Sequence, residues 1–333
     1  MARHSIIGGT ALVRVARLLP WALAASMGTG LAGAQTLGLG TTAPGGLVHS
    51  NGVAVAKVLV EKGGLKVVVQ PRGGTSERDV DSGNTQISLT NSMDLLFFLS
   101  GTGTHQGDPK HDGIRIVSPL MASRIAGWVR KDSDIKTISD VKNKRFPSGF
   151  TQQKIMLRVH EGLLANAGLS YGDVKRVATP SIARSQMDFV SGNTDVFFFT
   201  AGTARVKQAS AAVGGLRPIA VDNSADAIAR MKKFLPHAYV FTLKPSKRDP
   251  LITEPTPVLS YDLVLYVHTK LPDEIVYKMA KAMHDNKKVM VDVFGGLRQF
   301  QPKEMARQYE GLRHHPGAIK YYKEIGIWPA DGQ

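Results

Sequence analysis

Short apolar runs alternate with amphipathic stretches along most of the chain. The runs are rich in β-branched and aromatic residues, and they lie at 65–69, 87–90, 196–199, 239–242 and 263–267. This pattern is typical of strands buried in a sheet.

The stretches between these runs carry helix signals. Apolar residues recur every four positions from Ile155 to Leu163, and Gly168 follows as a stop signal. Ser181 begins a second helix that ends before Gly192, and Pro272 begins a third. Strands that alternate with helices predict an α/β fold with layers around mostly parallel sheets.

The first 34 residues have a different pattern. Three arginines precede or adjoin an apolar run over 18–31, which ends in the small residues Ala32-Gly33-Ala34. A basic start, a short apolar centre and small residues spaced A-x-A predict a secretory signal peptide over 1–34, and hence a periplasmic protein. A membrane anchor or an irregular N-terminal helix is the alternative interpretation.

Composition narrows the function classes. The chain has no cysteine, which excludes disulfides, thiolate nucleophiles and a lipoprotein anchor. Its net charge is +15, and three of these charges belong to 1–34. The basic residues are scattered and lack an interleaved aromatic platform, so we expect no nucleic-acid partner. The excess charge favours an anionic ligand or partner, or simply solubility.

Four Gly-, Ser- and Thr-rich segments stand where predicted strands meet predicted helices. They cover 38–46, 72–76, 147–152 and 200–203. Helix N-termini leave N–H groups unpaired and carry partial positive charge, so several of them converging would bind a carboxylate. The same residues also cap helices in many proteins, and both interpretations stay open.

The sequence lacks convincing motifs for metal binding, serine hydrolysis or dinucleotide binding. The histidines have no metal-binding spacing, and no Gly-x-Ser-x-Gly elbow is present. The segment Gly38-x-Gly40-x-x-Ala43 matches a dinucleotide fingerprint formally, but only three residues separate it from Ala34. We therefore expect no cofactor, no metal and no catalytic residue. For an enzyme, His49 is the one candidate base near these segments.

The order of the motifs resembles the TAXI-type solute-binding proteins of TRAP transporters, which are periplasmic receptors that feed an ion-driven permease. The resemblance extends from about Thr36 to Pro329. The segments that carry it are 40–46, 73–76, 138–145, 167–174, 195–202, 271–277 and 315–322.

The resemblance implies the type II periplasmic binding fold, in which two α/β lobes are joined by two crossing strands. It implies a first lobe over 35–127 and 260–333 and a second lobe over 128–259. The crossings are expected near Ala126–Val129 and Ser260–Val264.

The resemblance also implies a ligand held between the lobes by hydroxyls and backbone amides. Phe150 is expected to pack on the carbon skeleton of the ligand. The expected ligand-binding residues are Thr42, Thr75, Ser76 and Asn91 of the first lobe and Gly149, Phe150, Thr151, Thr200, Ala201 and Gly202 of the second. Arg72 or Arg78 could add positive charge to the site, but surface solvation is the expectation for each.

The implied function is a monomeric receptor that captures a small organic anion, a carboxylate or an amino acid, and delivers it to TRAP permease subunits. The chain departs from the family pattern at Val48-His49, where many members have an aromatic pair, and at Arg78, where Asn is common. These departures leave the ligand open. An exported enzyme on the same fold and a receptor for a membrane signalling partner are the alternatives.

Overall fold

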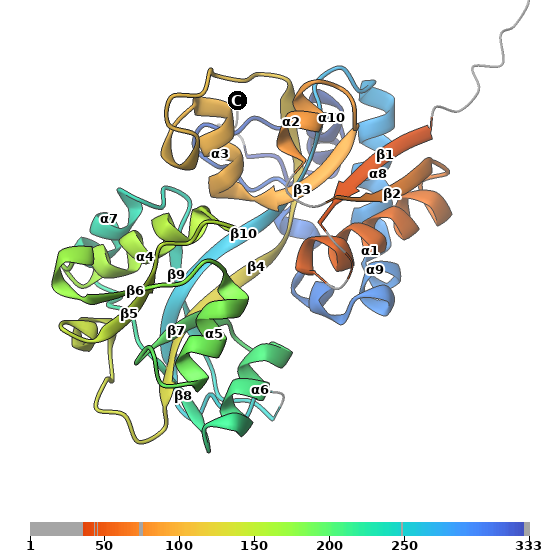
Figure 1. Ribbon diagram of the computed structural model, residues 1–333. Coiled ribbons are helices and arrows are strands. Elements are labelled where there is room, and N and C mark those ends of the chain that lie inside the picture. The colour runs from red at the N-terminus through yellow and green to blue at the C-terminus, as the bar shows by residue number, and fades with distance from the viewer. Residues whose placement is uncertain (1–35, 43, 45, 73–75, 248, 330–333) are drawn as a thin grey trace, which may run out of the picture. The chain divides into compact units, whose positions relative to one another are not determined.

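The computed structural model describes residues 36–42, 44, 46–72, 76–247 and 249–329 (Figure 1). The predicted signal peptide over 1–34 and the expected ligand residue Thr75 lie outside these residues. None of the described helices is long and apolar enough to cross a membrane.

Three parallel strands begin the main sheet. β1 lies between β2 and β3, and each of the three leads into a helix. Their carboxyl ends therefore share one edge of the sheet. The elements are β1 (Thr36–Thr41), α1 (Leu47–Glu61), β2 (Lys66–Pro71), α2 (Glu77–Asp81), β3 (Ile87–Asn91), α3 (Ser92–Ser100) and the 3₁₀ helix η1 (Gly103–His105).

Two long strands, β4 (Ile114–Arg130) and β10 (Thr256–His268), continue this sheet. They run antiparallel to each other and change their outer partners along their length. β10 pairs with β9 (Tyr239–Leu243) through 256–260 and with β3 through 263–267. β4 pairs with β7 (Phe197–Thr200) and β8 (Leu216–Ile219) through 125–130. The two strands thus connect two sets of elements.

These pairings correct one expectation and locate another. Among the described strands, three pairings are parallel and five are antiparallel, so the expectation of mostly parallel sheets is wrong. The reason is that β4 and β10 run in opposite directions through both sets. Ser260–Val264 coincides with the change of partners on β10. Ala126–Val129 already pairs with β7 and β8, so β4 changes partners before that segment.

The second set of elements also contains a small parallel sheet of β5 (Arg145–Ser148) and β6 (Lys175–Ala178). Ser181 accepts a hydrogen bond from the Arg184 amide and caps α5, as the sequence predicts. The helices of this set are η2 (Ile138–Val141), α4 (Ile155–Asn166), η3 (Tyr171–Asp173), α5 (Ile182–Val190), α6 (Ala204–Ala212) and α7 (Ala225–Lys232).

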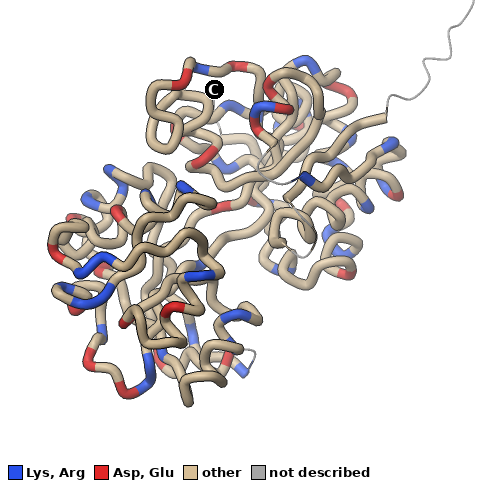
Figure 2. Tube along the Cα trace, in the orientation of Figure 1, with Lys and Arg blue, Asp and Glu red and all other residues tan. Residues whose placement is uncertain are grey.

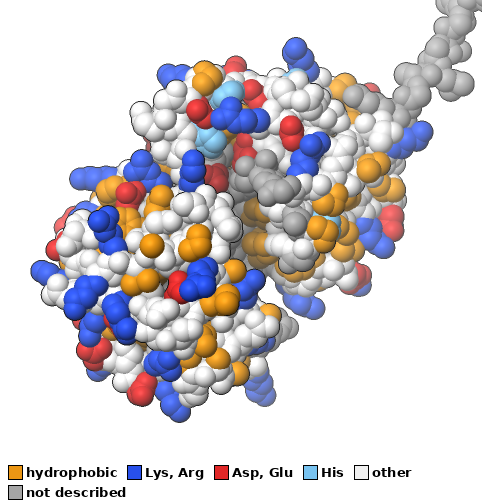
Figure 3. All heavy atoms as spheres, in the orientation of Figure 1, with side chains coloured by type: hydrophobic (Ala, Val, Ile, Leu, Met, Phe, Trp, Pro, Cys, Tyr) orange, Lys and Arg blue, Asp and Glu red, His pale blue; other side chains and the backbone are white. Residues whose placement is uncertain are grey.

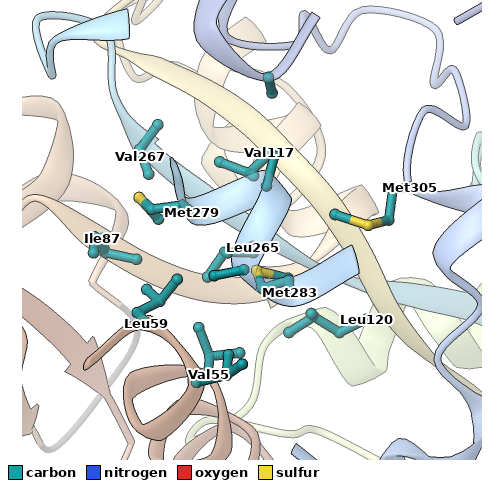
Figure 4. Close-up of a cluster of buried hydrophobic side chains, with 14 of the residues drawn as sticks. Val55, Leu59, Ile87, Val117, Leu120, Leu265, Val267, Met279, Met283 and Met305 are labelled. Atoms are coloured by element: carbon teal, nitrogen blue, oxygen red, sulfur yellow. The ribbon is translucent and has the colours of Figure 1, made fainter. Parts of the chain in front are cut away.

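The C-terminal segment returns to the first set. Met279 and Met283 of α8 are fully buried against Leu59 of α1 and Leu265 of β10, in the cluster that Figure 4 shows. The helix predicted to begin at Pro272 is confirmed, with Pro272 at its N-cap position. The elements are α8 (Asp273–Asp285), α9 (Lys287–Val293), η4 (Gly295–Gln299), η5 (Pro302–Glu304) and α10 (Pro316–Glu324).

Each set of elements has its own core. We call β1–β3 with α1–α3, α8–α10 and η4 the first lobe, and β5–β9 with α4–α7 the second lobe; β4 and β10 are common to both (Figure 1). The largest cluster of the first lobe contains Leu39 and Tyr322. The second lobe buries Phe146, Leu163 and Phe198 in a different cluster, to which α3 of the first lobe also contributes side chains.

Candidate functional site

The expected ligand residues of the first lobe lie at the carboxyl edge of its parallel strands. Thr42 is half-buried directly after β1, whereas Ser76 is only 1% exposed and its Oγ has no hydrogen-bond partner in the described structure. The side chain of Asn91 caps α3. Its Oδ1 accepts from the Asp94 amide at 2.7 Å, and its Nδ2 donates to Asp94 Oδ2 at 3.2 Å. Asn91 therefore has a structural role here.

The basic side chains near this edge form ion pairs or hydrogen bonds with neighbouring residues. Arg72 lies 3.2 Å from Asp79, and Arg78 lies 2.6 Å from Asp108. His49 Nδ1 lies 3.0 Å from the Thr41 hydroxyl, and no carboxylate orients its ring among the residues described. A general base is usually held by such a partner, so the geometry gives little support to His49 as a catalytic base.

The expected residues after β5 differ in burial. Gly149 and Thr151 are exposed, and the Thr151 amide donates to the Pro180 carbonyl at 3.2 Å. Phe150 is only 2% exposed, and its ring packs edge-on against His160 at 5.1 Å in the core of the second lobe. A side chain with this degree of burial stabilises the lobe, and it offers no free ring face for the carbon skeleton of a ligand.

A cavity of about 640 Å³ lies at the end of β7, and the expected ligand residues Thr200 and Ala201 line it. Gly202 follows directly. β4 contributes Ala122 and Arg124 to the lining, and η4 of the first lobe contributes Gln299. β9 contributes 241–243, and the loop after it contributes Lys244, Ser246, Asp249 and Ile252. Residues of both lobes therefore face one cavity. Figure 3 shows that the surface is hollowed between the lobes on the side facing the viewer.

Arg124 is the charged group of β4 in this cavity. Its guanidinium carbon lies 3.8 Å from the centre of the Phe241 ring, a cation–π contact. No ion pair or hydrogen bond of the guanidinium is found within the described residues, and Nε is buried without a partner. Burial lowers the pKa of Arg124, although an arginine keeps its charge at any ordinary pH. The cavity thus contains an unpaired, half-buried cation.

Two acceptors in the lining also lack partners. The Oδ1 atom of Asp249 and the Oε1 atom of Gln299 are buried, and neither accepts a hydrogen bond from the described part of the chain. Buried polar atoms are almost always hydrogen-bonded in folded proteins. One donor and two acceptors thus line a single cavity without a hydrogen-bond partner among the described residues.

A family model described as the NMT1-like family matches residues 39–326. The chain belongs to the NMT1-like family. This match covers both lobes and the two strands that join them, so the cavity lies wholly inside the NMT1-like region.

Solved structures show the same fold at low identity. A TctC solute-binding protein from Polaromonas matches this NMT1-like chain with a TM-score of 0.54 and 16% identity, over 89% of this chain and 99% of that one. A protein from Xanthomonas citri, solved with a bound chloride ion, matches with a TM-score of 0.52 and 10% identity, over 88% and 97%. The predicted α/β fold with two lobes, that of type II periplasmic binding proteins, is confirmed.

The NMT1-like chain has further charges that do not gather into one surface. Figure 2 shows Lys and Arg distributed over both lobes and interspersed with Asp and Glu. Among the described residues, no group of three His, Cys, Asp or Glu side chains could hold a metal ion. The electrostatic feature that distinguishes the site is therefore the local one, Arg124 in its cavity.

Sequence reasoning missed Arg124, Phe241, Asp249 and Gln299. For Arg124 a signal was present, because it is the one charged residue between Ile116 and Val129. A lone charge inside an apolar strand requires a partner or a function. Asp249 lies in a proline-rich segment without a binding motif, and Gln299 comes from a distant part of the chain, so neither had a local signal.

Proposed function

We propose that this chain is the periplasmic solute-binding receptor of a TRAP transporter, and that it captures a small organic anion between its lobes for delivery to a membrane permease. The observation that carries the proposal is the unpaired guanidinium of Arg124 in a cavity of about 640 Å³. A carboxylate beside Arg124 would compensate the buried charge and could accept two parallel N–H bonds.

Binding would be coupled to closure of the lobes. Arg124 and Thr200 lie on β4 and at the end of β7, whereas Gln299 belongs to the first lobe. Contacts from both sides form together only when the lobes approach, so the ligand shifts an open–closed equilibrium toward the closed form. We propose that the permease recognises that form. The resemblance implies lobe boundaries at 127/128 and 259/260, but β4 pairs with β7 from Ile125 onward, so we propose that the boundary on β4 precedes Ile125.

The TAXI assignment is supported by the order of seven sequence segments, from the Gly-Thr-rich loop at 40–46 to the segment at 315–322. The periplasmic location is supported by the signal-peptide pattern of 1–34. N-terminal sequencing of the protein from a periplasmic fraction is expected to begin at Gln35 or within a few residues of it. An intact N-terminus on cytoplasmic protein would contradict the location.

Thermal-shift screening tests the ligand class. We expect small organic carboxylates to raise the melting temperature and neutral sugars and simple amines to leave it unchanged. A ligand at 100 times its dissociation constant stabilises the fold by about 2.7 kcal/mol, which is readily measured. If only sugars or amines stabilise the protein, the anion proposal is wrong.

The structure favours binding over catalysis. No histidine lines the described cavity, and the candidate base His49 instead contacts Thr41, the last residue of β1. We therefore propose that the chain is not an enzyme. Unchanged recovery of the bound carboxylate after prolonged incubation is the expected result, and conversion of the ligand would contradict it.

A further inference from the structure

We propose that Asp249 and Gln299 form an acceptor subsite that recognises a hydrogen-bond donor on the ligand. The ligand is then a carboxylate that also carries a hydroxyl or ammonium group, and plain carboxylates bind less well. This inference rests on the proposed function, because it takes the carboxylate of the ligand to lie at Arg124.

Two acceptor atoms in the cavity are buried without hydrogen-bond partners among the described residues. Asp249 Oδ1 and Gln299 Oε1 are both buried, both line the cavity, and both lack a hydrogen-bond partner in the described structure. An acceptor that is removed from water without a partner destabilises the protein. A hydroxyl on the ligand would satisfy one of the two atoms and an ammonium could satisfy both, whereas the carboxylate itself offers only further acceptors.

Hydrogen bonds of its backbone hold Asp249 in position. Its amide donates to both the carbonyl oxygen and the Oγ of Ser246 at 3.2 Å, and its own carbonyl accepts from the Ile252 amide at 3.2 Å. The Oδ2 atom lies beside Gly202, where an added Cβ would approach it to 3.5 Å. Gly202 has a φ of +77°, which favours glycine at that position. The loop therefore presents the carboxyl group next to the end of β7.

No described basic residue forms an ion pair with Asp249. No ion pair joins Asp249 to Arg124, or to any other described basic residue, within 4.0 Å. Burial raises the pKa of Asp249, while the Leu251 amide and the charge of Lys207 oppose this effect. The carboxylate thus remains available to a ligand, and Arg124 remains available to an anion.

Two ligand donors fit this arrangement. A hydroxyl can donate one hydrogen bond, whereas an ammonium can donate several and also carries the charge opposite to that of Asp249. Both share the chemistry that the subsite requires. The charge on Asp249 distinguishes them, because only the ammonium gains from it.

Isothermal titration with matched acids tests the inference. Propionate, lactate and alanine share one carbon skeleton, and so do succinate, malate and aspartate. For at least one set we expect the donor-bearing acids to bind the wild-type protein ten or more times as tightly as the plain acid. Asp249→Ala should reduce this ratio to about threefold or less. Asp249→Asn should preserve the preference for hydroxyl and lose the preference for ammonium.

Two further variants serve as an independent test of the subsite and as a control. Gln299→Leu should also reduce the donor preference, which covers the case in which the Asp249 variants do not fold. Glu254→Ala changes an exposed carboxylate of the same loop and should leave all affinities within threefold of the wild type.

The possible results separate the inference from the function on which it rests. Plain and donor-bearing acids of equal affinity, with binding still dependent on Arg124, would overturn the acceptor subsite and leave the proposed function intact. If none of these acids binds the wild-type protein, both the anion receptor and the subsite are contradicted.

Discussion

Replacing Arg124 with glutamine is expected to weaken carboxylate binding at least about 30-fold while leaving the ligand-free protein as stable as before, or more stable. Loss of one partner of a buried charge pair costs about 2–5 kcal/mol of binding, and about 1.4 kcal/mol corresponds to tenfold. In the ligand-free protein the same guanidinium is half-buried on Phe241 without an anion, so its removal relieves a desolvation cost.

Matched variants sharpen this test. Arg124→Lys keeps the charge but loses the planar face that stacks on Phe241, so its affinity should lie between those of the wild type and Arg124→Gln. Arg130 lies on the same strand, 5.8 Å from the Phe189 ring and outside the lining of the cavity. Arg130→Gln should bind within threefold of the wild type. Titration calorimetry and urea unfolding measure the two effects, and an unchanged affinity for Arg124→Gln would contradict the proposed role.

Replacing Asp262 with alanine is expected to lower the free energy of unfolding by about 3–5 kcal/mol. Asp262 lies on β10 where that strand changes partners, and it is only 3% exposed. Its carboxylate accepts from Tyr239 at 2.9 Å, Tyr309 at 2.5 Å and Arg307 at 2.6 Å. Burial raises the pKa of Tyr309, and the Asp262 charge adds to this effect. The change would leave two hydroxyls and a guanidinium without their shared acceptor.

The comparison variant is Glu304→Ala, because Glu304 also pairs with Arg307, at 2.9 Å, but is exposed. An exposed ion pair contributes about 1 kcal/mol or less, so this change should have little effect. Urea unfolding curves for both variants give the comparison. If Asp262→Ala destabilises the protein no more than Glu304→Ala does, the network is not a structural tie between β9, β10 and the C-terminal segment.

Local patterning was sufficient for several elements of the fold. β3, β7 and β9 appear in the sequence as apolar or alternating runs. Ser181 predicts the start of α5, because a serine side-chain oxygen accepts a hydrogen bond from a free amide at a helix N-terminus. The direction of strand pairing had no such signal, because it depends on where β4 and β10 return in space. The length of β4 was also missed, since Pro119 and Ser118 interrupt its apolar run.

The candidate site was predictable only where a local motif reaches it. Thr200 and Ala201 follow a strand in a small-residue segment, and both line the cavity. Phe150 has the same sequence context, yet its ring lies in the core. The expectation failed because no local pattern distinguishes an inward-facing from an outward-facing aromatic side chain. The unsatisfied state of Asp249 and Gln299 is a property of the assembled cavity, so no sequence pattern could reveal it.

A crystal structure of the protein with the carboxylate that binds most tightly tests the central claim most directly. We predict the carboxylate in the cavity at the end of β7, with its oxygens about 2.7–2.9 Å from guanidinium nitrogens of Arg124, and with Gln299 brought against the same ligand. A carboxylate bound elsewhere, with the Arg124 guanidinium still unpaired, would contradict the account.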